Sequence, residues 1–273
     1  MHLKRVISAV IILPLFYLLV QYLPPMIFFI VVLFGILLGQ LEFYRFSYPT
    51  GKRGLILLGL LCSGLIAVHF YEPGLFLDRE VLTVLVGAVL LYQLAMQKDL
   101  TATLTDAAVS VLGVFYVGWL LGHLILLRNL DQGDSLIFFL FLVTWVGDTG
   151  AYYIGKGFGR RRMAPQISPH KTVEGAIGGW LAGILVAVLA QQWFLPLISV
   201  PDSLILGGLL GVVGQLGDLT ESMFKRGAGV KDSGHFLPGH GGVLDKLDSL
   251  IFTAPMFYYY LLWVKQLGRM VVI

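Results

Sequence analysis

Long hydrophobic segments, separated by short polar or proline-containing breaks, run through most of the chain. Nine of them stand out, at residues 6–22, 26–43, 54–70, 81–96, 107–127, 135–153, 175–195, 203–217 and 249–264. A helix needs about 20 apolar residues to cross the hydrocarbon layer of a membrane, and fewer when its ends snorkel. The pattern therefore predicts an all-α, polytopic integral membrane protein with about nine transmembrane helices.

The positive charges are distributed unevenly among the breaks between these segments. If the N-terminus is cytoplasmic, 15 of the 19 Lys and Arg residues fall on the inner side and 4 on the outer side. Membrane proteins carry an excess of Lys and Arg in their short cytoplasmic loops. We therefore expect a cytoplasmic N-terminus and, after nine crossings, a C-terminus outside. One crossing more or fewer would put the two most basic loops on opposite faces.

The composition supports the membrane class and excludes several others. Hydrophobic residues make up 57% of the chain and charged residues 13%, whereas a soluble domain carries about 25% charged residues. Cys62 is the single cysteine, so neither a disulfide framework nor a cysteine-based metal site is available within one chain. The N-terminus has the charge pattern of a secretory signal, but no small-x-small site follows, so we expect a first membrane helix. Nucleic acid is not among the expected partners.

The chain divides into an N-terminal region of transmembrane helices, 1–134, and a C-terminal region, 135–273, that carries two cytoplasmic loops. These loops are 154–174 and 218–248. Glycines recur along the helices between the loops, at Gly175, Gly179 and Gly183 and at Gly207, Gly211 and Gly214. Small residues on one face let helices approach closely in lipid. Tight packing of these helices would bring the two loops together.

Three carboxylates fall at the cytoplasmic ends of different predicted helices, namely Asp148, Asp218 and Asp245. An ionisable residue within a membrane segment costs about 2.5–3.5 kcal/mol on insertion scales, so it marks a candidate functional site. Carboxylates that converge at one depth suit a hard divalent cation such as Mg²⁺. Two alternatives stay open. Asp218 and Asp245 could be ordinary helix-end residues at the headgroups, and Asp148 could pair with a cation of a neighbouring helix.

A second candidate feature depends on whether the helix at 203–217 continues past Asp218. In that case Glu221, Ser222 and Lys225 follow on the same face. Nucleotidyl transfer needs carboxylates that bind metal beside fixed cations such as Lys225 and Arg226, because charge on the transferred group must be neutralised from several sides. The alternative interpretation is a solvated, charged helix end.

The glycine-rich segment PGHGG, at 238–242, is a candidate anion site. Consecutive glycines allow backbone N–H groups to turn toward an anion, and His240 could donate a hydrogen bond to a phosphate or accept one from a ribose. Lys171 precedes the helix at 175–195, whose N-terminus offers free N–H groups to an anion.

The stretch 222–248 resembles the signature of the phosphatidate cytidylyltransferases, also called CDP-diacylglycerol synthases. The residues that carry the resemblance are Ser222, Phe224, Lys225, Arg226, Lys231, Asp232, Gly234, Pro238, Gly239, His240, Gly241, Gly242, Asp245 and Asp248. The segments GDTGAYY (147–153) and SPHKTVEGAIGG (168–179) are also similar to that family. One position departs from the family pattern: Lys246 stands where the family has Arg, which keeps the charge and loses the bidentate fork.

The resemblance implies transfer of a cytidylyl group from CTP to phosphatidic acid, with release of pyrophosphate, in phospholipid biosynthesis. It implies Mg²⁺ as cofactor, with K⁺ as a candidate second ion, and Asp218 and Asp245 as the residues that hold the metal centre. Asp148, selected above by its place in a membrane segment, is the further candidate ligand. The implied catalytic residues are Asp218, Lys225, Arg226 and Asp245. The expected substrate contacts are Lys171, Ser222, Lys231, Asp232, His240, Gly241 and Lys246.

The expected partners are CTP, phosphatidic acid and membrane lipids, with a homodimer as a candidate assembly. We expect a multi-pass protein of the cell membrane with its active site on the cytoplasmic face. Two other functions remain open. One is a related CTP-dependent lipid enzyme, such as a polyprenol kinase or an ether-lipid cytidylyltransferase. The other is an anion transporter, which is disfavoured because the charges gather at one face and the chain has no internal repeat.

Overall fold

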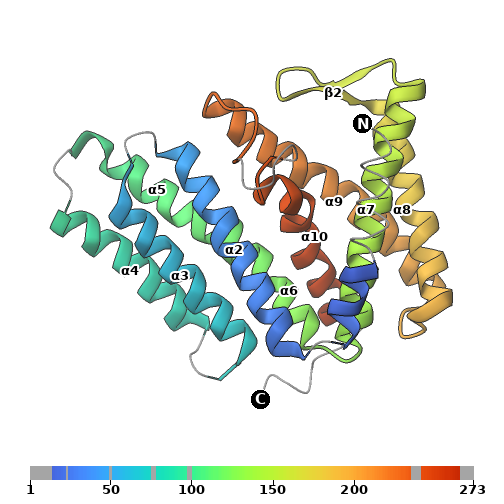
Figure 1. Cartoon of the computed structure of the whole chain (residues 1–273), viewed down its shortest axis with the longest axis horizontal. Coiled ribbons are helices and arrows are strands. Elements are labelled where there is room, and N and C mark those ends of the chain that lie inside the picture. The colour runs from blue at the N-terminus through green and yellow to red at the C-terminus, as the bar shows by residue number, and fades with distance from the viewer. Residues whose placement is uncertain are drawn as a thin grey trace.

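The computed structural model describes residues 14–22, 24–48, 51–74, 78–96, 100–234 and 241–264, and most of them are helical. Residues 14–22 are helical. The further helices are α2 (Pro25–Ser47), α3 (Arg53–Tyr71), α4 (Asp78–Met96), η1 (Leu100–Ala102), α5 (Thr103–Gly113), the π-helix η2 (Val114–Trp119), α6 (Leu120–Arg128), α7 (Gly133–Phe158), α8 (Val173–Phe194), α9 (Val200–Gly227) and α10 (Leu244–Trp263). Figure 1 shows their arrangement.

Every predicted hydrophobic segment overlaps a helix in the part of the chain that the structure describes. Six of the described helical stretches are long and apolar enough to cross a membrane: α2, α3, the continuous stretch Leu100–Arg128, α7, α8 and α9. The prediction of a helical membrane protein is therefore confirmed. The number of nine crossings and the sides on which the termini lie stay predictions.

The two predicted cytoplasmic loops are more ordered than the sequence indicated. In the first, α7 continues to Phe158, and β1 (Arg162–Ala164) then pairs antiparallel with β2 (Ser168–Thr172). The sequence did not predict this hairpin, because strands of three and five residues leave no hydrophobic periodicity to read, but the fold as a whole is helical as expected. The Thr172 side chain ends the hairpin by capping α8, since its Oγ1 accepts a hydrogen bond from Gly175 N at 3.1 Å.

In the second predicted loop, helix α9 continues past Asp218 as far as Gly227, which satisfies the condition on which the second candidate feature depended. Helix α10 then begins at Leu244. The described non-helical residues between them are therefore 228–234 and 241–243. With 28 residues, α9 is about 42 Å long at about 1.5 Å per residue. This length exceeds the roughly 30 Å hydrocarbon layer, so α9 can both cross the membrane and extend to its surface.

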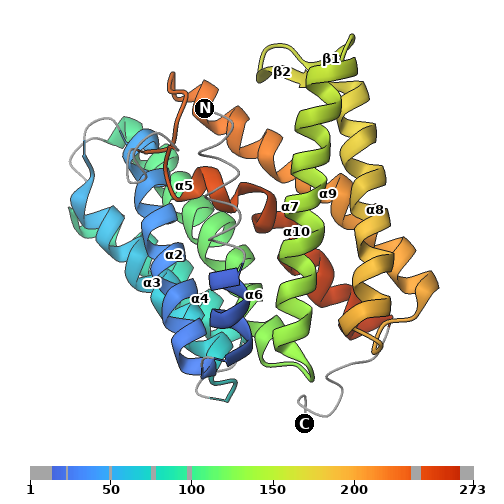
Figure 2. The ribbon, with the colours of Figure 1, turned by 45° about the vertical axis from the view of Figure 1, so that its right-hand side comes forward.

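Helix α10 connects the two parts of the molecule. It packs against α9 and α7 of the C-terminal region and against α6 and α2 of the N-terminal region. In Figures 1 and 2, α7 and α8 stand side by side, and α9 crosses them at a steep tilt next to α10. The hairpin caps the end of the molecule at which α7 ends and α8 begins. Because α10 touches both regions, residues of α2 can reach the segment that precedes α10.

Glycines produce the close packing that was predicted for the C-terminal helices. A Cβ atom at Gly179 of α8 would lie 2.6 Å from Gly147 O and 2.7 Å from Ala151 Cβ of α7. A Cβ atom at Gly207 of α9 would lie 2.6 Å from Ile184 Cα of α8. These backbones touch directly, so the prediction that small residues bring these helices together is confirmed.

We predict that Gly179→Ala destabilises the protein by about 1–3 kcal/mol, because the new methyl group has no room between α8 and α7. Gly64→Ala in α3 is the matched control, since nothing lies within 4 Å of a Cβ atom at that position. Thermal unfolding of the two purified variants in detergent measures the difference. Equal midpoints would contradict the packing described for these helices.

Candidate active site

Three carboxylates and one lysine gather where four elements meet. Asp148 comes from α7, Lys171 from β2, Asp218 from α9 and Asp248 from α10. Lys171 Nζ lies 2.6 Å from Asp218 Oδ2. The charges of Asp218 and Asp148 act on each other, and both act on Asp248. We call these four residues the open cluster, because Asp148 is exposed and the other three are half-buried.

Two serines support the open cluster from α9 and α10. Ser222 Oγ donates to Asp218 Oδ1 at 3.4 Å, one turn along α9. Ser249 Oγ donates to Asp148 Oδ2 at 3.4 Å, and Ser249 N donates to Asp248 Oδ1 at 2.7 Å. These bonds hold carboxylates that repel one another within a small volume.

A buried lysine forms the second feature of the site. Lys225 Nζ lies 2.6 Å from Asp245 Oδ1 and forms a further ion pair with Glu221, one turn earlier in α9. The side chains are 10% exposed for Lys225, 12% for Asp245 and 1% for Glu221. One buried cation thus faces two carboxylates. Removing a partner from such a group leaves an uncompensated buried charge, which is strongly destabilising.

Asp245 also fixes the backbone of the loop that precedes α10. Its Oδ2 accepts hydrogen bonds from Gly242 N at 2.7 Å and from Ser233 N at 3.1 Å. Gly241, next to Gly242, has a φ of 82°, a left-handed conformation that favours glycine. The sequence predicted Gly241 as a substrate contact, and the structure adds a conformational reason for glycine at this position.

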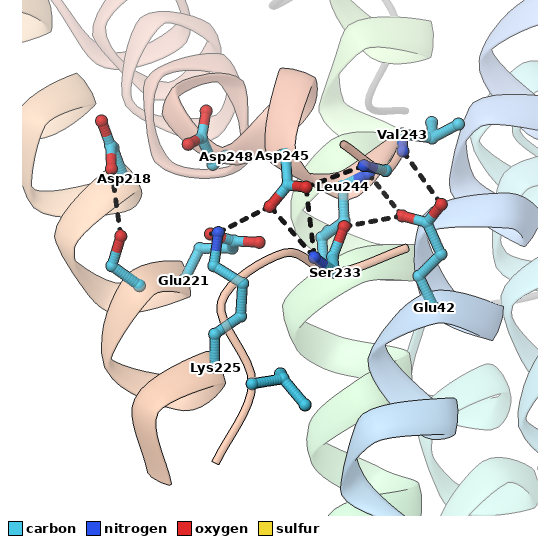
Figure 3. Close-up of polar contacts among 12 residues, drawn as sticks. Glu42, Asp218, Glu221, Lys225, Ser233, Val243, Leu244, Asp245 and Asp248 are labelled. Atoms are coloured by element: carbon cyan, nitrogen blue, oxygen red, sulfur yellow. Dashed lines mark hydrogen bonds and ion pairs between the residues drawn. The ribbon is translucent and has the colours of Figure 1, made fainter. Parts of the chain in front are cut away.

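Glu42 of α2 reaches the same loop from the other region of the molecule. It is 5% exposed, and its carboxylate accepts hydrogen bonds from Ser233 Oγ at 2.9 Å, Val243 N at 3.0 Å and Leu244 N at 2.9 Å. Figure 3 shows Glu42 on one side of the Lys225–Asp245 pair and Asp218 on the other. We call Glu42, Ser233, Asp245, Lys225 and Glu221 the closed network.

The other predicted site residues have varied environments. Arg226 is exposed, and its Nε and Nη1 donate to Ile167 O and Val230 O, both at 3.2 Å, which ties the hairpin turn to the end of α9. Lys231, Asp232 and Lys246 are exposed, and none of them makes a side-chain hydrogen bond or ion pair with the described residues. His240 lies outside the described residues.

The three predicted metal ligands fall into two groups. Asp148 and Asp218 belong to the open cluster, whereas both oxygens of Asp245 are engaged in the closed network. Among the residues that the structure describes, no three His, Cys, Asp or Glu side chains could hold a metal ion by themselves. Mg²⁺ is usually bound by one or two carboxylates together with substrate phosphates and water. The donor set of the open cluster, made of hard carboxylate oxygens, fits that mode.

Sequence reasoning missed Glu42 and left Glu221 without a role. A signal for Glu42 was present, since it is the only charged residue in the hydrophobic segment 26–43. An ionisable residue inside a membrane segment is a functional candidate by default. Applied to this segment, the rule that selected Asp148 would also have selected Glu42.

The fold and the site together define a class: a helical membrane protein whose charged residues gather at one end of its C-terminal helices. Comparison with known proteins narrows this class. The model of the cytidylyltransferase family matches residues 3–264. Since that match spans nearly the whole length, the chain belongs to the cytidylyltransferase family.

Individual relatives agree with this assignment. A protein of Bacillus subtilis (strain 168) named phosphatidate cytidylyltransferase is 36% identical over 255 residues, covering 85% of this chain and 93% of the relative. One of the same name from Synechocystis is 38% identical over 242 residues, covering 78% of each chain. Another from Staphylococcus epidermidis (strain ATCC 12228) is 43% identical over 159 residues, covering 55% of this chain and 57% of the relative.

We predict that Lys225→Met lowers stability by about 3–5 kcal/mol, because it leaves Glu221 and Asp245 buried without their cation. Lys246→Met is the matched control, since Lys246 is an exposed lysine at the start of α10. Thermal unfolding in detergent compares the two variants with the unmodified protein. Equal losses of stability in both variants would contradict the closed network.

Proposed function

We propose that the chain catalyses transfer of a cytidylyl group from CTP to phosphatidic acid, giving CDP-diacylglycerol and pyrophosphate. The observation that carries the proposal is the open cluster, in which Lys171 meets Asp218 beside two further carboxylates. Asp148, Lys171 and Asp248 lie in the segments 147–153, 168–179 and 222–248, which resemble the family. The names of the relatives specify the same reaction. Phosphatidate cytidylyltransferase activity makes the chain a nucleotidyltransferase of phospholipid biosynthesis.

The reaction depends on charge stabilisation and on the positioning of the two substrates more than on a strong base. A phosphate oxygen of phosphatidic acid forms a bond to the α-phosphorus of CTP, and the bond from that phosphorus to the oxygen bridging to the β-phosphate breaks. The electron pair leaves with pyrophosphate. Because the lipid phosphate is already an anion near neutral pH, the site must bring two anions together and stabilise the charge on the leaving group.

The two lysines of the site are suited to different roles. Lys171 is half-buried, and Asp218 is its only ion-pair partner among the described residues, so it can move from that carboxylate to a phosphate of CTP. Lys225 is buried between Glu221 and Asp245, so we assign it to holding Asp245 in place. Arg226, at the surface beside the hairpin, can still contact phosphate, because its two hydrogen bonds use only part of the guanidinium donor set.

Asp218 and Asp148, with Asp248 beside them, are the residues that would hold Mg²⁺. When bound, the ion would neutralise charge on the α-phosphate and on the departing pyrophosphate. Asp245 remains the predicted further ligand from the family resemblance. K⁺ as a second ion also stays a prediction. The carboxylates of the open cluster keep this metal position next to Lys171.

The placement of the site fits two substrates from different phases. CTP is soluble, whereas phosphatidic acid stays in the membrane leaflet. The C-terminal halves of α7 and α9, strand β2 just before α8, and the N-terminal end of α10 carry the site residues, so the site lies at one end of these helices. We propose that this end faces the cytoplasm in a cell membrane, in keeping with nine crossings and a cytoplasmic N-terminus. Assembly as a homodimer stays a prediction.

The direct test supplies purified protein with radiolabelled CTP, phosphatidic acid and Mg²⁺, and measures labelled CDP-lipid. We expect product from the unmodified chain and a loss of about 10²–10³-fold or more in Asp218→Asn, because a charge that acts in the transition state is removed. Asp131→Asn, an exposed aspartate before α7, is the control and should keep full activity. Absence of any CDP-lipid from the unmodified chain would contradict the proposal.

Two variations of this assay separate the related enzymes. Replacing phosphatidic acid by an ether-linked phosphatidate tests the ether-lipid cytidylyltransferase. Replacing it by a polyprenol, with CTP labelled on the γ-phosphate that a kinase transfers, tests the polyprenol kinase. We expect the highest kcat/KM with the ester-linked phosphatidic acid. A product formed with the polyprenol, and none with phosphatidic acid, would favour the kinase.

We predict that removing divalent metal abolishes turnover reversibly. An excess of EDTA should stop product formation, and added Mg²⁺ should restore it, because no lysine of the site can replace a cation that binds two phosphates at once. A calcium-saturated chelator serves as the control for the chelator itself. Full activity at vanishing free Mg²⁺ would show that the open cluster does not work through a metal.

A further inference from the structure

Glu42 combines deep burial with an unusual set of partners. It lies on α2 and is the only charged residue of the hydrophobic segment 26–43, and its carboxylate is nearly inaccessible. Burying a carboxylate costs free energy unless hydrogen bonds replace its water. Here three donors do so, and two of them are the backbone N–H groups of Val243 and Leu244 at the start of α10.

These two N–H groups belong to a helix start that lacks a cap of its own. Val243 occupies the N-cap position of α10 and makes no side-chain capping bond. The first N–H groups of a helix have no partner within the helix, and the positive end of the helix dipole favours an anion there. Glu42 supplies the missing cap from a helix about 200 residues away in the sequence.

Glu42 and Asp245 together hold both ends of the glycine-rich loop. Ser233, before the loop, donates its side-chain hydroxyl to Glu42 and its backbone N–H to Asp245. After the loop, Gly242 N donates to Asp245, and the next two residues donate to Glu42. Two carboxylates from different regions of the molecule therefore fix the same two points of the backbone.

The glycines at these points leave room for the carboxylate of Glu42. A Cβ atom at Gly234 would lie 2.6 Å from Glu42 Oε1, and one at Gly242 would overlap Glu42 Oε2 and Ser233 Oγ. The loop and the carboxylate thus fit each other closely. A shift of Glu42 would move the loop, and with it the partners of Asp245 and Lys225.

We propose that Glu42 is a positioning residue for cytidylyl transfer: it fixes Ser233 and the backbone of Val243 and Leu244, which lie on either side of the predicted anion-binding segment 238–242 in the sequence. The N-terminal region is then part of the active site and not a membrane anchor alone. This inference rests on the proposed function and adds to it a residue outside the family signature. Because the predicted substrate contacts His240 and Gly241 lie between these fixed points in the sequence, loss of Glu42 should weaken the use of CTP more than that of phosphatidic acid.

The test compares Glu42→Gln with Gln40→Met. Glutamine has the shape of glutamate but presents an NH₂ group to one of the N–H or O–H donors, so at least one bond is lost. Gln40 is also buried on α2, and its Nε2 donates to Tyr44 OH at 3.0 Å and to Gly59 O at 3.1 Å, in contact with α3. Its replacement therefore gives a structural defect in the same helix without touching the loop.

We expect Glu42→Gln to raise the KM for CTP about tenfold or more, because a hydrogen bond to a charged acceptor is lost and the free energy of such a bond corresponds to a factor of this size. The KM for phosphatidic acid should change less than threefold, and the Gln40→Met variant should keep the KM for CTP of the unmodified protein even if its unfolding midpoint falls. An unchanged KM for CTP in folded Glu42→Gln would overturn the inference. So would an equal rise in Gln40→Met.

Ser233→Ala keeps the inference testable if Glu42→Gln does not fold. It removes the hydroxyl bond to Glu42 and leaves the backbone bond to Asp245, so a smaller rise in the KM for CTP is expected. If both variants fold, their effects should be less than additive, because they act on one contact. Strict additivity, or no effect of Ser233→Ala, would speak against the inference. An inactive unmodified protein would instead refute the proposed function itself.

Discussion

Buried carboxylates in an apolar helical bundle must find donors, and this constraint organises the whole site. Irregular backbone within a membrane protein is tolerated only where its polar groups are satisfied by protein or water. Here the described residues 228–234 and 241–243 leave the helical conformation, and Glu42 and Asp245 accept the N–H groups of Ser233, Gly242, Val243 and Leu244. The same bonds fix the start of α10, which packs against helices of both regions. These two carboxylates therefore connect Ser233 to the start of α10.

The site separates charges that hold structure from charges that can bind ligand. In the closed network each charged group has buried partners at hydrogen-bond distance, as Lys225 and Asp245 illustrate. The open cluster instead holds three carboxylates, Asp148, Asp218 and Asp248, beside one lysine, Lys171. Carboxylates therefore outnumber cations in this cluster, which favours binding of a metal ion. Because bound metal ions and phosphates carry charges of their own, they can neutralise the net charge that the cluster has without ligands.

The helices could be predicted from the sequence because membrane segments are recognisable by their length and hydrophobicity. The glycine spacing also indicated correctly where α7, α8 and α9 touch. It also selected Asp218 and Lys171 without showing that they pair. The hairpin was missed because its strands are short and carry no alternating pattern. The bond from Glu42 to the loop joins residues about 200 positions apart, and no local rule reaches that far. The engagement of Arg226 with the hairpin turn likewise depends on tertiary structure.

The account distinguishes two roles for carboxylates, and one measurement tests that distinction directly. Turnover is titrated with free Mg²⁺ at saturating CTP in the unmodified protein, in Asp148→Asn and in Glu42→Gln. If the open cluster holds the metal and the closed network holds the loop, Asp148→Asn requires a higher Mg²⁺ concentration for half-maximal turnover. Glu42→Gln then keeps the Mg²⁺ midpoint of the unmodified protein. The same shift in both variants, or a shift in Glu42→Gln alone, would contradict the account.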